Sequence, residues 1–315
     1  MKKILVVGSL NMDFVVSVKR MPKPGETLLT EDMELICGGK GANQAYALGK
    51  LGADVTLLGA VGKDFYGEMQ IDSLTAAGVD TSRIARIDGV STGIALITVN
   101  EEGDNSIIVV QGANKRVDKG YIDSNINLIR ESDIVIFQLE IPLDTVVYAV
   151  EKCKEFGKTV ILDPAPAPGS LPTELLKNVD IIKPNESELA VLTGIEDVKG
   201  SMEKAVGFIK RQGVKNVIVT LGGNGSYVFA QDDKVWHIDG EEVKVVDTTA
   251  AGDSFIAALA FSITQGKDII ASAKYANRVA SIVVTKKGAQ SSMPSSDEVA
   301  EYFTKISQKS VCDRK

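Results

Sequence analysis

Short apolar runs rich in β-branched residues alternate along this chain with segments of helical periodicity. The runs span residues 4–7, 55–58, 134–137, 159–162, 179–182 and 217–221, and the helical segments span 41–51, 69–77, 145–156, 202–211 and 255–264. This alternation predicts βαβ units, and therefore a doubly wound α/β fold with a mostly parallel central sheet and helices on both faces. Ligands of such folds bind beyond the carboxyl ends of the strands. We therefore expect the functional residues in the loops at that edge.

Two stretches, at about residues 14–36 and 92–110, do not follow this alternation. The second reads as a hairpin, because two apolar runs flank the polar segment 100–105, and the first contains the turn signal Pro22-Lys-Pro-Gly25. Together they predict a small β-sheet that projects from the edge of the main sheet. A lid over the site and a dimer interface would each explain it. We expect a single domain over residues 1–315, with the lid formed by these two insertions.

The charge and the cysteines narrow the class of protein. A formal net charge of −7 argues against a broad nucleic-acid or membrane-surface role, since phosphate backbones need a concentrated basic face. Cys37, Cys153 and Cys312 form no paired framework, and the only histidine, His237, has no thiol nearby, so neither disulfides nor a zinc site is expected. The first apolar run turns polar at Asn11, too early for a signal peptide or a membrane span. We expect a cytoplasmic protein and assign His237 no role.

The segment Asp247-Thr-Thr-Ala-Ala-Gly-Asp253 carries the strongest chemical signal. It follows a strand-like stretch at 242–246 and opens an apolar helix. Exposed N–H groups at a helix start favour an anion, so the turn 250–252 is suited to hold a phosphoryl group in transfer. Asp253 would then accept a proton from a hydroxyl that attacks phosphorus. The alternative is that Asp253 only caps the helix, as short acidic residues often do.

A second glycine-rich segment, residues 38–43, also precedes a helix. It lacks the spacing of a P-loop, and no dinucleotide fingerprint follows any predicted strand. Its glycines suit either a backbone pressed against a polyhydroxyl ligand or a tight packing turn. Asn11, Asp13 and Glu140 follow predicted strands, where their side chains suit sugar hydroxyls. The alternative for each is a turn residue bonded to its own backbone.

A third segment, residues 183–188, combines a strand end, a proline and a helix start. Asn185 and Glu188 lie three residues apart, which suits either the hydration shell of Mg²⁺ or a capping box. The segments 220–225 and 286–292 are either further ligand-binding turns or simple connections between secondary-structure elements. The spacing alone does not separate these alternatives.

In order and spacing, the segments 8–13, 38–43, 183–188 and 247–253 resemble the ribokinase family over nearly the whole chain. The resemblance implies ATP-dependent transfer of a phosphoryl group to the 5-hydroxyl of ribose, on a doubly wound sheet with a small β lid that also forms a homodimer. The 183–188 and 247–253 motifs are shared with kinases of other substrates, whereas residues 11–13 and 38–43 favour ribose. The alternatives are a kinase of deoxyribose, fructose, ketodeoxygluconate or adenosine, and a non-catalytic sugar sensor. An NAD-dependent oxidoreductase lacks its glycine fingerprint here.

The resemblance also assigns roles by position. It implies Asp253 as the base, with Ala250, Ala251 and Gly252 as the anion hole. The implied sugar contacts are Asn11, Asp13, Gly39, Lys40, Asn43 and Glu140, and the implied ATP contacts are Asn185, Thr220, Gly222, Gly225 and Asn277. Potassium would lie among Asp247, Thr249, Val283, Lys286, Gly288 and Ser292, and Glu188 would hold Mg²⁺ through water.

Overall fold

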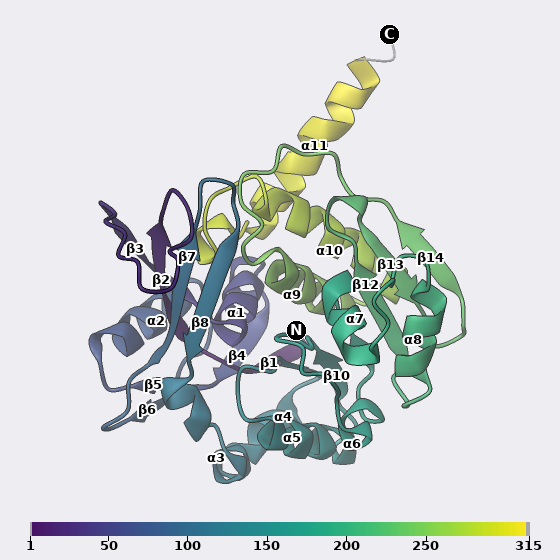
Figure 1. Ribbon diagram of the computed structural model, residues 1–315. Coiled ribbons are helices and arrows are strands. Elements are labelled where there is room, and N and C mark those ends of the chain that lie inside the picture. Colours follow the sequence, from purple (N-terminus) through teal and green to yellow (C-terminus); the bar gives the residue numbers. More distant parts are fainter. Residues whose placement is uncertain (1, 313–315) are drawn as a thin grey trace.

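A computed structural model describes residues 2–312 and shows an eight-stranded central sheet between two layers of helices (Figure 1). The strands follow the order β14-β13-β12-β11-β10-β9-β1-β4. Their bounds are β1 (Lys3–Val7), β4 (Asp54–Leu58), β9 (Ile134–Phe137), β10 (Thr159–Leu162), β11 (Ile181–Ile182), β12 (Asn216–Thr220), β13 (Ser226–Phe229) and β14 (Val235–Ile238). All neighbours pair in parallel except β12–β13 and β13–β14. The prediction of a doubly wound, mostly parallel sheet is confirmed.

The helices divide between the two faces of this sheet. One layer contains α1 (Lys40–Lys50), α2 (Phe65–Ala76), α9 (Ala251–Thr264) and α10 (Ile269–Val283). The other contains α3 (Lys119–Ser124), α4 (Ile126–Glu131), α5 (Leu143–Glu155), α6 (Thr173–Leu176), α7 (Glu186–Thr193) and α8 (Met202–Lys210). The last helix is α11 (Ser296–Cys312). Within residues 2–312, none of the helices is long and apolar enough to cross a membrane.

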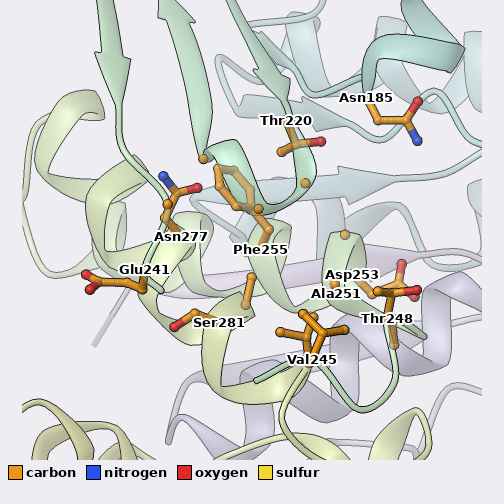
Figure 2. A pocket seen from close by; sticks show the side chains of 18 of the residues that line it. Asn185, Thr220, Glu241, Val245, Thr248, Ala251, Asp253, Phe255, Asn277 and Ser281 are labelled. Carbon is orange, nitrogen blue, oxygen red and sulfur yellow. The ribbon is translucent and has the colours of Figure 1, made fainter. Parts of the chain in front are cut away.

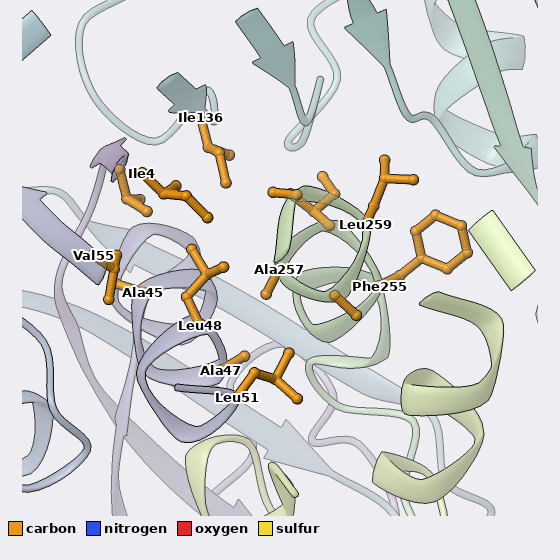
Figure 3. Packing of buried hydrophobic residues seen from close by; sticks show 14 of the residues in the cluster. Ile4, Ala45, Ala47, Leu48, Leu51, Val55, Ile136, Phe255, Ala257 and Leu259 are labelled. Carbon is orange, nitrogen blue, oxygen red and sulfur yellow. The ribbon is translucent and has the colours of Figure 1, made fainter. Parts of the chain in front are cut away.

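Alternate residues of each strand enter different cores, as the period of a strand requires. Ile4 and Val6 of β1 pack toward α1 and α9, whereas Leu5 and Val7 pack toward the opposite layer. Figure 3 shows the first core, in which strand side chains meet Leu48 of α1 and Leu259 of α9. Because both faces are covered, the strands are apolar on both sides, which explains the continuous apolar runs of the sequence.

A separate small sheet has the order β3-β2-β7-β8. It is built from β2 (Asn11–Ser17), β3 (Met33–Gly38), β7 (Gly93–Val99) and β8 (Asn105–Val110), the two stretches that did not fit the βα alternation. Two short strands, β5 (Ala60–Gly62) and β6 (Ala85–Ile87), pair beside it. The small sheet begins directly beyond the carboxyl end of β1, and Figure 1 shows it standing beside α1.

One expected strand is absent from the described residues. Residues 242–246, which precede the 247–253 motif, adopt no strand in the structure. Instead, the N–H groups of Val246 and Asp247 both donate to the carbonyl of Val284, at the end of α10. The prediction of a strand there is wrong, because this apolar stretch lies against a helix end rather than beside another strand.

Candidate active site

A cavity of about 620 Å³ opens beyond the carboxyl ends of the central strands. Its walls come from the start of α9, the β11–α7 connection, the glycine turn after β12 and the inner face of α10. In Figure 2 the labelled side chains of Asn185, Thr220, Asp253 and Asn277 surround it from four different elements. The site therefore lies at the edge where the fold class predicts it.

Asp253 lies inside the first turn of α9 and is 5% exposed. The residue at the N-cap position is Ala250, and no side chain caps this helix. The carboxylate of Asp253 instead accepts hydrogen bonds from Asn43 Nδ2 and from Gln44 Nε2, each at 3.0 Å. Asp253 is therefore not the helix cap that the local sequence also allowed, because both of its oxygens are bonded to amides of α1.

The surroundings of Asp253 raise its pKa. Burial has the largest effect and raises the pKa of Asp253. The charge of Lys40 and the two amide donors lower this pKa, and the negative charge of Asp163 raises it. The net shift of the pKa is upward. A raised pKa makes a carboxylate a stronger base when it is ionised. The position and raised pKa of Asp253 are compatible with the predicted role of a base.

The turn of Ala250, Ala251 and Gly252 opens α9 and lines the cavity. Ala250 has φ +59°, a left-handed conformation that non-glycine residues seldom adopt. The first N–H groups of a helix have no partner within it. The N–H of Ala251 donates to the Thr248 carbonyl at 3.3 Å, whereas those of Gly252 and Asp253 are available to an anion. Lys183 adds positive charge, since its Nζ would lie 3.0 Å from a Cβ placed on Gly252. The turn has the composition of a phosphoryl-binding site.

A second polar cluster lies between β1, β9 and α1. Glu140 accepts hydrogen bonds from Asn11 Nδ2 at 3.4 Å and from the backbone N–H of Lys40 at 3.1 Å. Gly39 allows this approach, because it has φ +88° and a Cβ there would collide with the backbone of residues 10 and 11. Asn43 Oδ1 is buried without a hydrogen-bond partner and is therefore free to accept one. The cluster thus offers several donors and acceptors to a polyhydroxyl ligand.

Asp13 and Lys40 are two groups near this cluster whose pKa values are shifted. Burial and, to a smaller extent, the charges of nearby Glu140 and Asp253 together raise the pKa of Asp13 to about 7. For Lys40, burial lowers the pKa, but the carboxylates of Asp253, Asp163 and Glu140 act more strongly, so the net shift is upward and the ammonium stays charged. Lys40 and Asp253 also line the cavity, and they therefore join it to the polar cluster.

The residues with predicted roles at the nucleotide all line the cavity. These are Asn185, Thr220, Gly222, Gly225 and Asn277, together with Glu188. Asn185 and Glu188 form a complete capping box for α7: Asn185 Oδ1 accepts from the Glu188 N–H, and Glu188 Oε2 accepts from the Asn185 N–H, each at 2.8 Å. The capping alternative is confirmed. It leaves the other oxygen of Glu188 for a hydrated cation, so a role at Mg²⁺ stays a prediction.

Asp247 joins the start of the 247–253 motif to the loop after α10. Its Oδ1 accepts from the N–H of Thr249 at 2.9 Å, and its Oδ2 accepts from the N–H of Gly288 at 2.8 Å. Burial raises the pKa of Asp247, but these hydrogen bonds and that of the Thr249 hydroxyl lower it overall. The hydroxyl of Ser292 donates to the Ala289 carbonyl, and the ammonium of Lys286 lies 3.2 Å from Glu298. The Lys286 side chain thus points to α11.

Such a loop suits a monovalent cation held by one carboxylate and backbone carbonyls. Val283, at the end of α10, lies beside the loop that contains Gly288. Within residues 2–312, no three Asp, Glu, His or Cys side chains are grouped to hold a metal ion. A site built mainly from carbonyl oxygens would not form such a group.

The comparison with known proteins agrees with this geometry. A family model described as pfkB family carbohydrate kinase matches residues 1–296. The chain belongs to this family. Among its relatives is the ribokinase of Staphylococcus aureus (strain COL), which is 39% identical over 300 residues, covering 94% of this chain and 98% of that protein. The deoxyribokinase of Salmonella typhi is 37% identical over 302 residues, covering 96% and 98%.

Solved structures show the same fold. The Arabidopsis thaliana ribokinase complexed with ribose and ATP is 36% identical, with a TM-score of 0.89, covering 95% of this pfkB-family chain and 98% of that one. The fold of this carbohydrate kinase is therefore that of the ribokinases, as the sequence motifs imply.

Four residues near the site of this pfkB-family kinase were not predicted from the sequence: Gln44, Gln138, Asp163 and Lys183. Gln44 Nε2 donates to Asp163 Oδ2 at 3.0 Å as well as to Asp253, and Gln44 Oε1 accepts from Gln138 Nε2 at 2.6 Å. Asp163 in turn lies 3.5 Å from the ammonium of Lys183, and both side chains are almost fully buried. Three of the four, Asp163, Lys183 and Gln138, directly follow buried strands. The criterion that selected Glu140, a polar side chain just after a predicted strand, would therefore have found these three but not Gln44.

Proposed function

We propose that this kinase transfers the γ-phosphoryl group of ATP to the 5-hydroxyl of D-ribose. The observation that carries the proposal is the place of Asp253, which lies between a polyhydroxyl-binding cluster and an anion-binding helix start. Support comes from the ribokinase relatives and from a structural neighbour that is a ribokinase complexed with ribose and ATP.

In the proposed mechanism, Asp253 accepts the proton of the attacking hydroxyl while the oxygen forms its bond to phosphorus. The bond from the γ-phosphorus to the bridging oxygen breaks, and ADP leaves. The N–H groups of Gly252 and Asp253, with the ammonium groups of Lys40 and Lys183, stabilise the charge on the transferred group. Positioning and electrostatics carry most of the catalysis in phosphoryl transfer.

Two ions complete the proposal. When bound, Mg²⁺ would neutralise charge on the ATP phosphates, and Asn185 with Glu188 would hold it through water. A potassium ion would strengthen the positive potential of the anion hole from a site made by Asp247, Thr249, Val283, Lys286, Gly288 and Ser292. The hydrogen bonds of Asp247 to Thr249 and Gly288 support this site, because they draw the two loops around it together.

We further propose that the small sheet is a lid over the sugar and the interface of a homodimer. Three of its strands meet at the polar cluster, since Asn11 starts β2 and pairs with Gly38 at the end of β3 and with Gly93 at the start of β7. The register of its strands places Met33, Leu35, Leu96, Ile108 and Val110 on one face, and each is more than 40% exposed. An apolar sheet face of this kind favours association with a second copy. We place the enzyme in the cytoplasm, in keeping with its free thiols and its use of ATP.

The sugar is tested by release of ADP with a panel of acceptors. Deoxyribose is the second candidate, because two deoxyribokinases are 37% identical to this chain. We expect kcat/KM for ribose to exceed that for deoxyribose by about tenfold or more, since a polar site left facing a missing hydroxyl loses binding energy. A higher kcat/KM for deoxyribose, fructose, ketodeoxygluconate or adenosine would contradict the choice of ribose. Absence of turnover with all of them would favour a sugar sensor.

The cation site gives a second prediction. Wild-type activity should be higher in potassium than in sodium, and Asp247→Ala should lose most of this difference, because the carboxylate that joins the two loops is removed. The measurement is the initial rate in each salt at equal ionic strength. Asp232→Ala, an exchange on the exposed β13–β14 turn, is the matched control and should keep the wild-type potassium response. A full potassium response in Asp247→Ala would contradict the site.

The pKa of Asp13 gives a third prediction. Below about pH 7 its carboxyl is protonated and loses an acceptor for sugar hydroxyls, so KM for ribose should rise as the pH falls. Because the folded-state pKa lies above the ordinary value, ionisation of Asp13 opposes folding, and stability is lost as the pH rises toward 7. Asp13→Asn should therefore bind ribose weakly yet raise Tm at pH 8 by roughly a few degrees. Unchanged Tm together with wild-type KM in Asp13→Asn would contradict this account.

A further inference from the structure

Asn114 lies at the root of the small sheet, by which we mean the end of the sheet where β2 begins at Asn11. It has no role in the mechanism above. It is 1% exposed and belongs to a short 3₁₀ turn, η1 (Gly112–Arg116), that follows β8. Its Oδ1 accepts from the N–H of Leu10 at 3.0 Å, and its Nδ2 donates to the Leu10 carbonyl at 3.2 Å and to Asn11 Oδ1 at 2.7 Å. Because the Leu10 N–H can only donate, the orientation of the Asn114 amide is fixed.

That orientation determines which end of the Asn11 amide faces the polar cluster. Asn11 Oδ1 is occupied by the hydrogen from Asn114, so Asn11 Nδ2 must point the other way, toward Glu140 Oε2 at 3.4 Å. The fit is tight, because a Cβ on Gly93 would collide with both Asn11 Oδ1 and Asn114 Nδ2. Asn11 therefore presents a hydrogen-bond donor to the sugar side.

The same contact lies where the strands of the small sheet converge. Asn11 pairs with Gly38 of β3 and with Gly93 of β7, and the chain of β8 leads into the turn that contains Asn114. Gln70 Nε2 donates to the carbonyls of both Asn11 and Gly38, which fixes this junction from the other side. The residue that orients Asn11 is therefore also attached to the root of the sheet.

We infer that Asn114 is a positioning residue for the sugar: it holds the Asn11 amide with its donor toward Glu140 and links sugar binding to the root of the small sheet. It does so through Asn11, without contacting the sugar. The inference rests on the proposed function, in which Asn11 is a sugar contact.

The test is Asn114→Asp, which replaces a donor by an acceptor facing Asn11 Oδ1. We expect KM for ribose to rise by about tenfold or more. The reason is that repulsion between the new carboxylate and Asn11 Oδ1 in a buried network costs at least about 1.4 kcal/mol. The kcat and the KM for ATP should stay within about threefold of wild type, since the phosphate side is untouched. Asn125→Asp, the same exchange in the α3–α4 turn, is the matched control and should leave all three constants unchanged.

A double-mutant cycle with Asn11→Ala separates positioning from a general loss of structure. If Asn114 acts through Asn11, Asn114→Asp should add little to KM once Asn11 is absent. Additive effects, or a wild-type KM in folded Asn114→Asp, would overturn the inference. Should the aspartate variant fold poorly, Asn114→Ala goes through the same cycle. The cycle uses whichever sugar the wild type phosphorylates and is paired with calorimetric sugar binding, so that an error in the proposed substrate is distinguished from an error in the role of Asn114.

Discussion

Asp253→Asn is expected to lower kcat by about 10³-fold or more, the usual range for a lost general base that also positions the nucleophile. The amide cannot accept the hydroxyl proton. It also places a donor against Asn43 Nδ2 or Gln44 Nε2, which both donate to Asp253 in the native site. Binding of ATP should persist, because the glycine turns and Asn277 that line the cavity are unaffected. The measurements are single-turnover rates and calorimetric ATP binding.

The control for this prediction is Asp268→Asn. Asp268 caps α10 through its side chain, which accepts from the Ala271 N–H, and asparagine caps a helix equally well. This variant should keep the wild-type kcat. Turnover of Asp253→Asn within tenfold of wild type would show that Asp253 is not the base.

Lys183→Met is expected to lower kcat by about 10²-fold, the effect typical of removing one preorganised group that stabilises transition-state charge. The Lys183 ammonium lies over the anion-hole turn and lines the cavity, whereas of the predicted sugar contacts only Lys40 and Asp253 line it. KM for ribose should therefore change little. The measurement is steady-state kinetics with each substrate varied in turn.

The same substitution leaves the buried Asp163 carboxylate without its ammonium partner. Breaking a buried pair costs about 3–5 kcal/mol, so Tm should fall. The double variant Lys183→Met/Asp163→Asn should recover much of this stability, because the remaining buried charge is removed, but it should not recover kcat. Recovery of both would show that Lys183 serves only to neutralise Asp163.

The central sheet was predictable because its physical cause is local. A strand covered on both faces must be apolar throughout, and six such runs are visible in the sequence. The same rule failed at residues 242–246, where Val245 and Val246 are more than half exposed and the backbone bonds to Val284 instead of a neighbouring strand. A short stretch with β-branched residues is therefore not enough to identify a strand, because its composition fixes neither its burial nor its hydrogen-bond partner.

The site was predictable where its residues follow strands or open helices, as with Asn11, Glu140 and Asp253. The choice between base and cap for Asp253 was not, because either role places an acid in the first turn of a helix. The cap is excluded by the hydrogen bonds from Asn43 and Gln44, which lie 210 and 209 positions away. Side chains that act only through such distant partners leave no local pattern in the sequence.

The central claim is that this site transfers phosphate from ATP to the primary hydroxyl of ribose. Phosphorus NMR of a reaction with ATP, Mg²⁺, K⁺ and D-ribose tests it directly. The account predicts ADP and one sugar phosphate in equal amounts, with the phosphorus coupled to the pair of protons on C5 of ribose. A phosphate coupled to the anomeric proton, or hydrolysis of ATP without any sugar phosphate, would contradict it.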